Sequence, residues 1–208
     1  GLGVSKPVLI NGFQIGRVDK LELQPNGTII ATLKINDKYD IPHNTIARLE
    51  EEHTEIKSLA KNYAEKLFGT IPVIYADAGF EGVAIRFRQQ INENSKMLCW
   101  HHVVPEMNHN EIVGWRKSNE DISVIFLRNN TDFDRNQERM SFTKNVIKQY
   151  TSKVFDLFSK GDTDIERSLY LINVCDWISF YLAEINDVDA IEVDIITSLK
   201  DKLAENPL

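Results

Sequence analysis

Cysteine is scarce in this sequence of 208 residues, and the two that occur, Cys99 and Cys175, lie far apart. Neither belongs to a Cys-x-x-Cys pair or to a Cys/His spacing that could bind zinc, so a zinc finger and a dithiol redox motif are excluded. Two isolated cysteines favour buried free thiols in a reducing compartment over a disulfide. We therefore expect a cytoplasmic protein.

Long apolar runs and a surplus of basic residues are also missing. The apolar stretches are only a few residues long, which excludes a transmembrane helix and the apolar core of a signal peptide. The net charge is -7, and Lys and Arg form no basic stripe, so neither a membrane nor a nucleic acid is an expected partner. The 42% of hydrophobic residues is enough for a real core, in one large domain or two small ones.

The charge and the hydrophobic periodicity both change near residue 50. Residues 1–50 hold six Lys or Arg and five Asp or Glu, a net charge of +1, which leaves -8 for residues 51–208. The first fifty residues predict short antiparallel strands, two of them around the turn Asn11-Gly12. These strands are expected at residues 8–10, 13–15, 21–23, 28–35 and 45–49. A β segment of this size is marginal alone and needs a partner or further strands.

Residues 51–208 predict an α/β domain, because strands and helices alternate as they do around a parallel, doubly wound sheet. Apolar positions at helical spacing indicate helices at residues 55–68, 83–93, 135–160, 165–185 and 190–203, with a short helix before Trp115. Short apolar runs, typical of strands buried on both faces, occur at residues 71–76, 97–100 and 123–127. The sequence thus divides into a β segment, residues 1–50, and an α/β domain, residues 51–208.

Familiar catalytic motifs are absent from the α/β part. It has no GxSxG elbow for a nucleophile, no GxGxxG fingerprint for a dinucleotide and no HExxH zinc motif. Five residues of metal-ligating types lie close in sequence: His101, His102, Glu106, His109 and Glu111. However, a single Glu-x-x-His falls short of a di-iron site, and His101 and His102 point to opposite faces if they lie in a strand. We expect neither a metal nor an organic cofactor.

The stretch from Arg86 to Trp115 instead concentrates side chains that can transfer protons. Glu93 and His109 each stand between two asparagines that can fix their orientation by hydrogen bonding. A carboxylate held in this way can move a proton between carbons next to a carbonyl, and an imidazole can protonate or deprotonate a ring oxygen. A structural interpretation stays open for both, because a glutamate at a helix end is often a cap or a solvated charge and a lone histidine usually packs.

The β segment contains a pattern of Gly, Val, Pro and Asn residues. It is carried by three stretches, Gly3–Val8, Asn11–Val18 and Ile41–Ala47. In this pattern the first fifty residues resemble the MCE/MlaD family of lipid-transport proteins. The resemblance implies lipid handling in an envelope compartment, whereas a β-rich segment that serves only packing or assembly is the alternative. The membrane anchor of that family and the rest of its β-barrel have no counterpart here.

The α/β domain carries a more specific pattern, which includes Asn-Glu-Asn-x-Lys and Pro-Glu-x-Asn-His-Asn-Glu. The matching stretches are Ile71–Tyr75, Gly79–Lys96, Pro105–Trp115, Leu169–Leu171 and Asp176–Ala183. In these residues the chain resembles the C-terminal half of bacterial bifunctional phosphoglucose/phosphomannose isomerases, which have the sugar isomerase (SIS) fold. We therefore expect an α/β fold with an SIS-type parallel sheet flanked by helices, preceded by the small antiparallel segment.

The resemblance implies aldose–ketose isomerisation of a six-carbon sugar phosphate through a cis-enediol, without a metal. Glu93 matches the base that moves the proton between C1 and C2. His109 matches the acid/base that opens the sugar ring, which in this family is supplied across the interface of a homodimer. Lys200 matches a lysine near the C-terminus that contacts the sugar.

The N-terminal SIS half of that family, which binds the substrate phosphate, has no counterpart in the sequence. The chain therefore resembles a fusion or chimera of two families. Because a missing phosphate pocket removes binding energy that positions the substrate, we expect weak or no isomerase activity from the chain by itself. The alternative function is an MCE-type lipid-binding or assembly module joined to a non-catalytic α/β domain.

Overall fold

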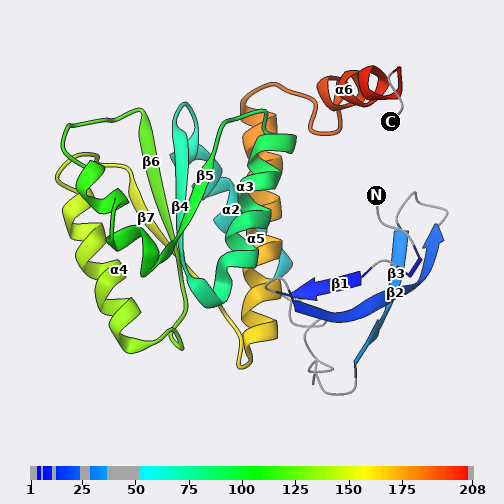
Figure 1. The fold of residues 1–208 in the computed structure, drawn as a ribbon, viewed down its shortest axis with the longest axis horizontal. Coiled ribbons are helices and arrows are strands. Elements are labelled where there is room, and N and C mark those ends of the chain that lie inside the picture. Colours follow the sequence, from blue (N-terminus) through cyan, green and yellow to red (C-terminus); the bar gives the residue numbers. More distant parts are fainter. Residues whose placement is uncertain (1–3, 6, 11–12, 24–28, 37–51, 206–208) are drawn as a thin grey trace.

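The small N-terminal sheet has three antiparallel strands, β1 (Pro7–Ile10), β2 (Phe13–Leu23) and β3 (Ile29–Ile35), in the order β1-β2-β3. The computed structural model describes residues 4–5, 7–10, 13–23, 29–36 and 52–205. Both predicted hairpin pairings are confirmed, although β2 is one continuous strand where the sequence predicted two. The predicted turns of these hairpins and the strand predicted at residues 45–49 lie outside the described residues. Figure 1 shows this sheet on the α5 side of the larger domain.

The larger domain is built on a four-stranded parallel sheet with the order β5-β4-β6-β7. Its strands are β4 (Ile71–Asp77), β5 (Trp100–Val104), β6 (Ile122–Arg128) and β7 (Val154–Phe158). Most residues of β4 and β6 are buried, which fits their inner positions, because strands of a parallel sheet are covered on both faces.

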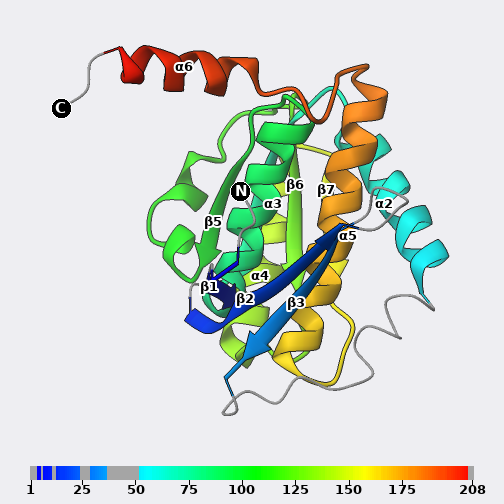
Figure 2. The same ribbon diagram turned by 90° about the vertical axis from the view of Figure 1, so that its right-hand side faces the viewer.

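Helices cover both faces of the parallel sheet, as the sequence predicted (Figures 1 and 2). The α-helices are α2 (His53–Leu67), α3 (Glu81–Asn94), α4 (Asp134–Ile147), α5 (Asp164–Ile185) and α6 (Asp194–Ala204). Three 3-10 helices, η1 (Ala78–Phe80), η2 (Glu106–Asn108) and η3 (Glu111–Gly114), lie after strands β4 and β5. Among the described residues, no helix has both the length and the apolar character needed to span a membrane.

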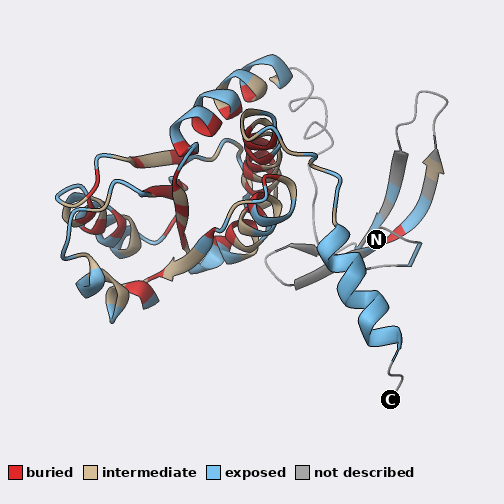
Figure 3. Ribbon diagram, turned by 90° about the horizontal axis from the view of Figure 1, so that it is seen from above, coloured by how far each residue is buried: buried red, intermediate tan, exposed pale blue. Residues whose placement is uncertain are grey.

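The sheet separates two apolar cores. Figure 3 shows many of the buried residues in the strands of the sheet and in the helices beside it. Ile74 of β4 belongs to the larger core, where the sheet packs against α2, α3 and α5. Its neighbour Tyr75 belongs to the smaller core with Met107 and Met140, under η2 and α4. This alternation follows from the two-residue period of a strand. Both cysteines are free and buried, as predicted.

Helix α5 packs against both α2 and α3 and holds these layers together. It begins with a capping box, in which the hydroxyl of Thr163 accepts from the backbone N–H of Glu166 and the Glu166 carboxylate accepts from the N–H of Thr163. Such reciprocal bonds satisfy two of the backbone donors that a helix start leaves open. The Arg86 guanidinium on α3 also donates two hydrogen bonds to Asp176 on α5, at 3.1 and 2.7 Å.

Two predicted elements are wrong in extent. The helix predicted at residues 135–160 ends at Ile147, and the residues from Val154 to Phe158 form β7. These residues pair with β6 in parallel, and this pairing overrides the helical spacing of their apolar side chains. The strand predicted at residues 97–100 instead runs from Trp100 to Val104.

Gly161 precedes α5 in a backbone conformation that side chains rarely adopt, with φ +135°. An added Cβ there would lie 2.5 Å from the Cβ of Glu166 and 3.0 Å from the backbone N of Arg167. We expect Gly161→Ala to lower the free energy of unfolding by about 2–4 kcal/mol, from backbone strain and steric overlap together. Urea denaturation of the variant measures this loss.

Gly114→Ala is the matched control for this variant. A Cβ at Gly114 would meet none of the described atoms within 4 Å, and its φ is not positive. It should therefore change stability by less than about 0.5 kcal/mol. Equal losses in the two variants would contradict the role assigned to Gly161.

Candidate active site

Glu93 lies on the exposed surface of α3, one residue before the helix ends at Asn94. The helix end is fixed by a group of buried or half-buried polar residues. Ser95 is 1% exposed, and its hydroxyl donates to the backbone oxygen of Ser179 on α5 at 2.8 Å. The Asn186 amide in turn donates to the backbone oxygen of Ser95 at 3.2 Å. The backbone that bears Glu93 is thus held against the end of α5.

The asparagines that flank Glu93 bind other parts of the chain than the Glu93 carboxylate, within the residues that the structure describes. The Asn92 amide donates to the backbone oxygen of Met97 at 2.8 Å. The Asn94 amide donates to the side chains of Gln90 and Ser179, at 2.8 and 3.0 Å. The hypothesis that these asparagines orient Glu93 is therefore replaced by a different one, in which they fix the chain on both sides of it.

His109 follows η2 and is exposed, like Glu93. Its backbone N–H donates to the carbonyl oxygen of Glu106 at 3.0 Å. The flanking asparagines again serve the chain: Asn108 donates to Thr143 Oγ1 at 2.8 Å, and Asn110 Oδ1 accepts from the N–H of Glu111 at 2.6 Å. Glu93 and His109 therefore have the same local arrangement: each is an exposed titratable side chain on a backbone that neighbouring asparagines fix.

Glu93 and His109 lie at opposite ends of the strands of the parallel sheet. Helix α3 returns from the carboxyl end of β4, so Glu93, at its end, lies near the amino ends of the strands. Strand β5 then runs forward parallel to β4, and His109 follows its carboxyl end. The two ends are separated by the length of α3, about 20 Å at 1.5 Å per residue. One copy of this domain does not bring Glu93 and His109 together.

Lys200 lies on α6, near the Glu93 end of the domain (Figures 1 and 2). The Lys96 ammonium connects the two regions, because it donates to the backbone oxygens of Glu93 and Glu192, both at 2.6 Å. Helix α6 itself has no buried residue, and Lys200 is exposed on it. Large apolar side chains of α6 are exposed too, among them Ile195 at 86% and Leu203 at 65%.

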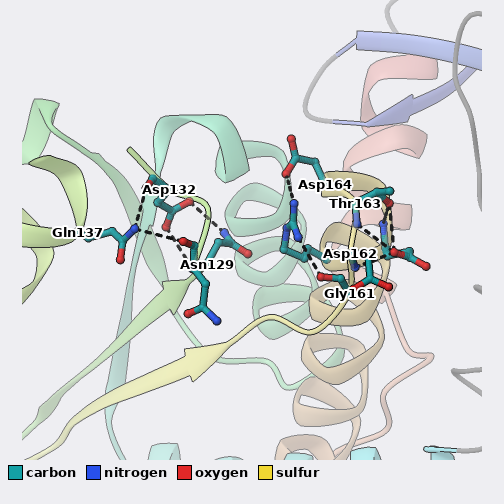
Figure 4. Close-up of polar contacts among 10 residues, drawn as sticks. Asn129, Asp132, Gln137, Gly161, Asp162, Thr163 and Asp164 are labelled. Carbon is teal, nitrogen blue, oxygen red and sulfur yellow. Dashed lines mark hydrogen bonds and ion pairs between the residues drawn. The ribbon is translucent and has the colours of Figure 1, made fainter. Parts of the chain in front are cut away.

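A second group of polar residues, which the sequence analysis missed, lies at the carboxyl ends of the strands (Figure 4). Asp77, at the end of β4, accepts from the Asn136 amide at 2.6 Å. Asp132, in the loop after β6, accepts from the backbone N–H of Asn129 at 3.1 Å, and Gln137 binds the backbone oxygen of Asp132 at 2.8 Å. The carboxyl edge is where open α/β sheets generally bind ligands.

Asp132 is 7% exposed, and burial raises its pKa from 3.8 to about 6, with a further contribution from the negative charge of Asp77. A carboxyl with a raised folded-state pKa binds its proton more tightly in the folded chain than in the unfolded one. Its stabilising contribution is therefore complete below about pH 4 and is lost as the pH rises through about 6.

We expect Asp132→Asn to remove this component of the pH dependence, since the amide does not ionise. Asp132 lowers the unfolding free energy of the unmodified chain as the pH rises from 4 to 7. In Asp132→Asn this decrease should be smaller by on the order of 2 kcal/mol. Denaturation at a series of pH values measures it, with Asp121→Asn, at an exposed position, as the control. An unchanged pH profile in Asp132→Asn would refute the assignment.

Among the described residues, no group of three or more His, Cys, Asp or Glu side chains could hold a metal ion. The described surface beside His109 does contain a pocket of about 600 Å³. It is lined by Asn108, Ile112, Arg135, Glu138, Arg139 and Phe142. The Phe142 side chain is 65% exposed, and the nearby Val113 is 62% exposed, so this face of the domain presents apolar surface.

A family model described as the bacterial phospho-glucose isomerase C-terminal SIS domain matches residues 56–203, a range that contains Glu93, His109 and Lys200. The chain belongs to this family. A second family model, of the MlaD protein, matches residues 1–58, where the sequence shows the same resemblance. The SIS fold predicted for the α/β domain is confirmed.

Four curated relatives share one name, bifunctional phosphoglucose/phosphomannose isomerase, while a fifth, matched over only 31% of this chain, is a D-glucosamine-6-phosphate 4-epimerase. A bifunctional phosphoglucose/phosphomannose isomerase from Caldicellulosiruptor bescii is 34% identical over 203 residues, which cover 96% of this chain and 57% of the relative. One from Aquifex aeolicus is 32% identical over 160 residues, covering 76% and 50%. The chain thus spans about half the length of the curated relatives it matches. Because the first alignment leaves only 4% of this chain unmatched, it includes most of residues 1–50 as well.

Solved structures share the fold at low sequence identity. A glucose-6-phosphate isomerase like protein from Thermus thermophilus has a TM-score of 0.56 at 17% identity, over 68% of this chain and 46% of that one. The C-terminal domain of glucosamine-fructose-6-phosphate aminotransferase from Francisella tularensis has a TM-score of 0.54 at 12% identity, over 73% and 49%. These similarities concern the fold alone.

Proposed function

We propose that this chain is the catalytic C-terminal part of a cytoplasmic sugar-phosphate isomerase that interconverts an aldose and a ketose phosphate through a cis-enediol. Its substrates are glucose 6-phosphate or mannose 6-phosphate and fructose 6-phosphate. Membership of the bacterial phosphoglucose isomerase family carries the proposal, since the matched range includes the residues able to transfer protons. The MlaD-like match of residues 1–58 is the basis of the alternative, a lipid-binding module, which the isomerase relatives do not favour.

Glu93 acts as the base in this proposal. A carboxylate can remove the proton from C2 of the aldose and return it to C1, while the enediol forms and collapses. The exposed position of Glu93 on a fixed helix end suits this role, because the carboxylate can reach a substrate while its backbone stays in place. His109 opens the sugar ring by proton exchange with the ring oxygen and hydroxyl, and Lys200 contacts the sugar.

His109 serves the site of a second copy of the chain, in a homodimer. The position of Glu93 and His109 at opposite edges of the sheet supports this arrangement, since one domain holds them about the length of α3 apart. The apolar surface beside His109, with Phe142 and Val113 exposed, offers a contact face for the second copy. A twofold axis would then form two equivalent sites.

Proton transfer by Glu93 can be measured directly, even at low turnover. In D₂O, an enediol intermediate introduces deuterium at C1 of fructose 6-phosphate, and nuclear magnetic resonance detects it. We expect Glu93→Gln to slow this incorporation by about 10²- to 10⁴-fold, because the amide cannot act as a base. Glu65→Gln, at an exposed position on α2, is the matched control and should leave the rate unchanged. Incorporation at the same rate in Glu93→Gln would rule out Glu93 as the base.

The dimer proposal is tested by mixing two inactive variants, Glu93→Gln and His109→Ala, after dissociation and reassociation. Mixed dimers contain one site with both residues intact and one site with neither. Random reassociation should therefore restore about a quarter of the wild-type activity, because half of the dimers are mixed and half of their sites are intact. If both residues served the same subunit, the mixture would stay as inactive as its components.

A further inference from the structure

The segment from Glu106 to Glu111, which carries His109, is tied to the domain on both sides of that residue. On the N-terminal side, Met107 is fully buried, and the Asn108 amide donates to the hydroxyl of Thr143 on α4 at 2.8 Å. Thr143 is itself fully buried, so this contact joins η2 to the smaller core. The exposed His109 comes next in the chain.

On the C-terminal side, both carboxylate oxygens of Glu111 are engaged. Oε1 accepts from the Tyr75 hydroxyl at 2.5 Å, and Oε2 lies 2.6 Å from His102 Nδ1. The two partners belong to neighbouring strands, because Tyr75 of β4 pairs with His102 of β5. The Trp115 indole N–H lies 3.4 Å from the Tyr75 oxygen and closes the group. A carboxylate that bridges two strands in this way forms strong, charge-assisted hydrogen bonds.

The Tyr75 hydroxyl is a dependable donor to Glu111. Its side chain is fully buried between the sheet and η3, and burial, together with the charge of Glu111, raises its pKa well above the ordinary tyrosine value. The phenol is therefore protonated near neutral pH and can donate to Glu111. Glu111 in turn reaches His109 through a short stretch of backbone, in which Asn110 accepts from the N–H of Glu111 at 2.6 Å.

We propose that Glu111 is a positioning residue for His109, acting through its bonds to Tyr75 and His102 and not through contact with the substrate. The proposal rests on the function proposed above, in which His109 opens the sugar ring. A histidine that must reach into the site of another subunit needs a fixed backbone, because a displacement of about 1 Å can cost about 100-fold in rate. The two contacts at Asn108 and Glu111 supply that fixed backbone.

Backbone hydrogen exchange tests the positioning role without any need for activity. In Glu111→Ala, the amides of His109 and Glu111 should exchange at least about tenfold faster, because the segment loses its attachment to β4 and β5. Glu120→Ala is the matched control: this exposed carboxylate also makes two hydrogen bonds, to the backbone N–H and hydroxyl of Ser152, at 3.0 and 2.8 Å. Unchanged exchange at both amides in Glu111→Ala would overturn the proposal.

Kinetic coupling then separates positioning from a general loss of stability. We expect Glu111→Ala to slow ring opening by about 10- to 100-fold in the unmodified chain, and by less than about twofold in a His109→Ala background. Glu111→Gln, whose amide oxygen can still accept from Tyr75, should recover part of the rate. Losses that are equal in both backgrounds would overturn the proposal.

The two readouts distinguish the possible failures. If exchange accelerates in Glu111→Ala but His109→Ala has no effect on isomerisation, the attachment of the segment stands and the proposed function of His109 fails. If exchange is unchanged, the positioning role fails whatever the activity.

Discussion

Strand β4 lies between β5 and β6 and has buried residues on both faces, and the rest of the structure depends on this position. One face contributes Ile74 to the core under α2, α3 and α5, while Tyr75 on the other face enters the core under α4. Because its neighbours are parallel, the chain must return along a helix after β4 before β5 can pair with it. The end of α3 and the loop after β5 therefore lie at opposite ends of the strands.

This constraint explains why the candidate catalytic residues of one chain stand apart. Glu93 is exposed at the end of the return helix, and His109 is exposed beyond the end of the next strand. At both positions the neighbouring asparagines fix the chain, so the rigidity of the backbone and the exposure of the titratable group occur together. The homodimer proposed above would bring Glu93 of one copy to His109 of another, which one domain does not do.

Much of the fold could be predicted, because it is encoded in short-range patterns. Helices α2, α3 and α5 were placed to within two residues by their apolar spacing, and β4 and β6 by short apolar runs. Strand β7 was missed because Val154 and Leu157 are also spaced as on a helix face, and only pairing with β6 makes the segment a strand. Strand β5 was misplaced because it lies at the edge of the sheet, where His101 and His102 are tolerated half-buried.

The sequence by itself determined the α/β alternation, the small antiparallel segment and the two motifs that contain Glu93 and His109. These depend on periodicity and on residue types within short windows, which the folding of the rest of the chain does not alter. Only the tertiary structure decided that the two residues lie at opposite edges, and that Glu111 bridges Tyr75 and His102. Such contacts join residues far apart in the chain, and they form only once the order and direction of the strands are set.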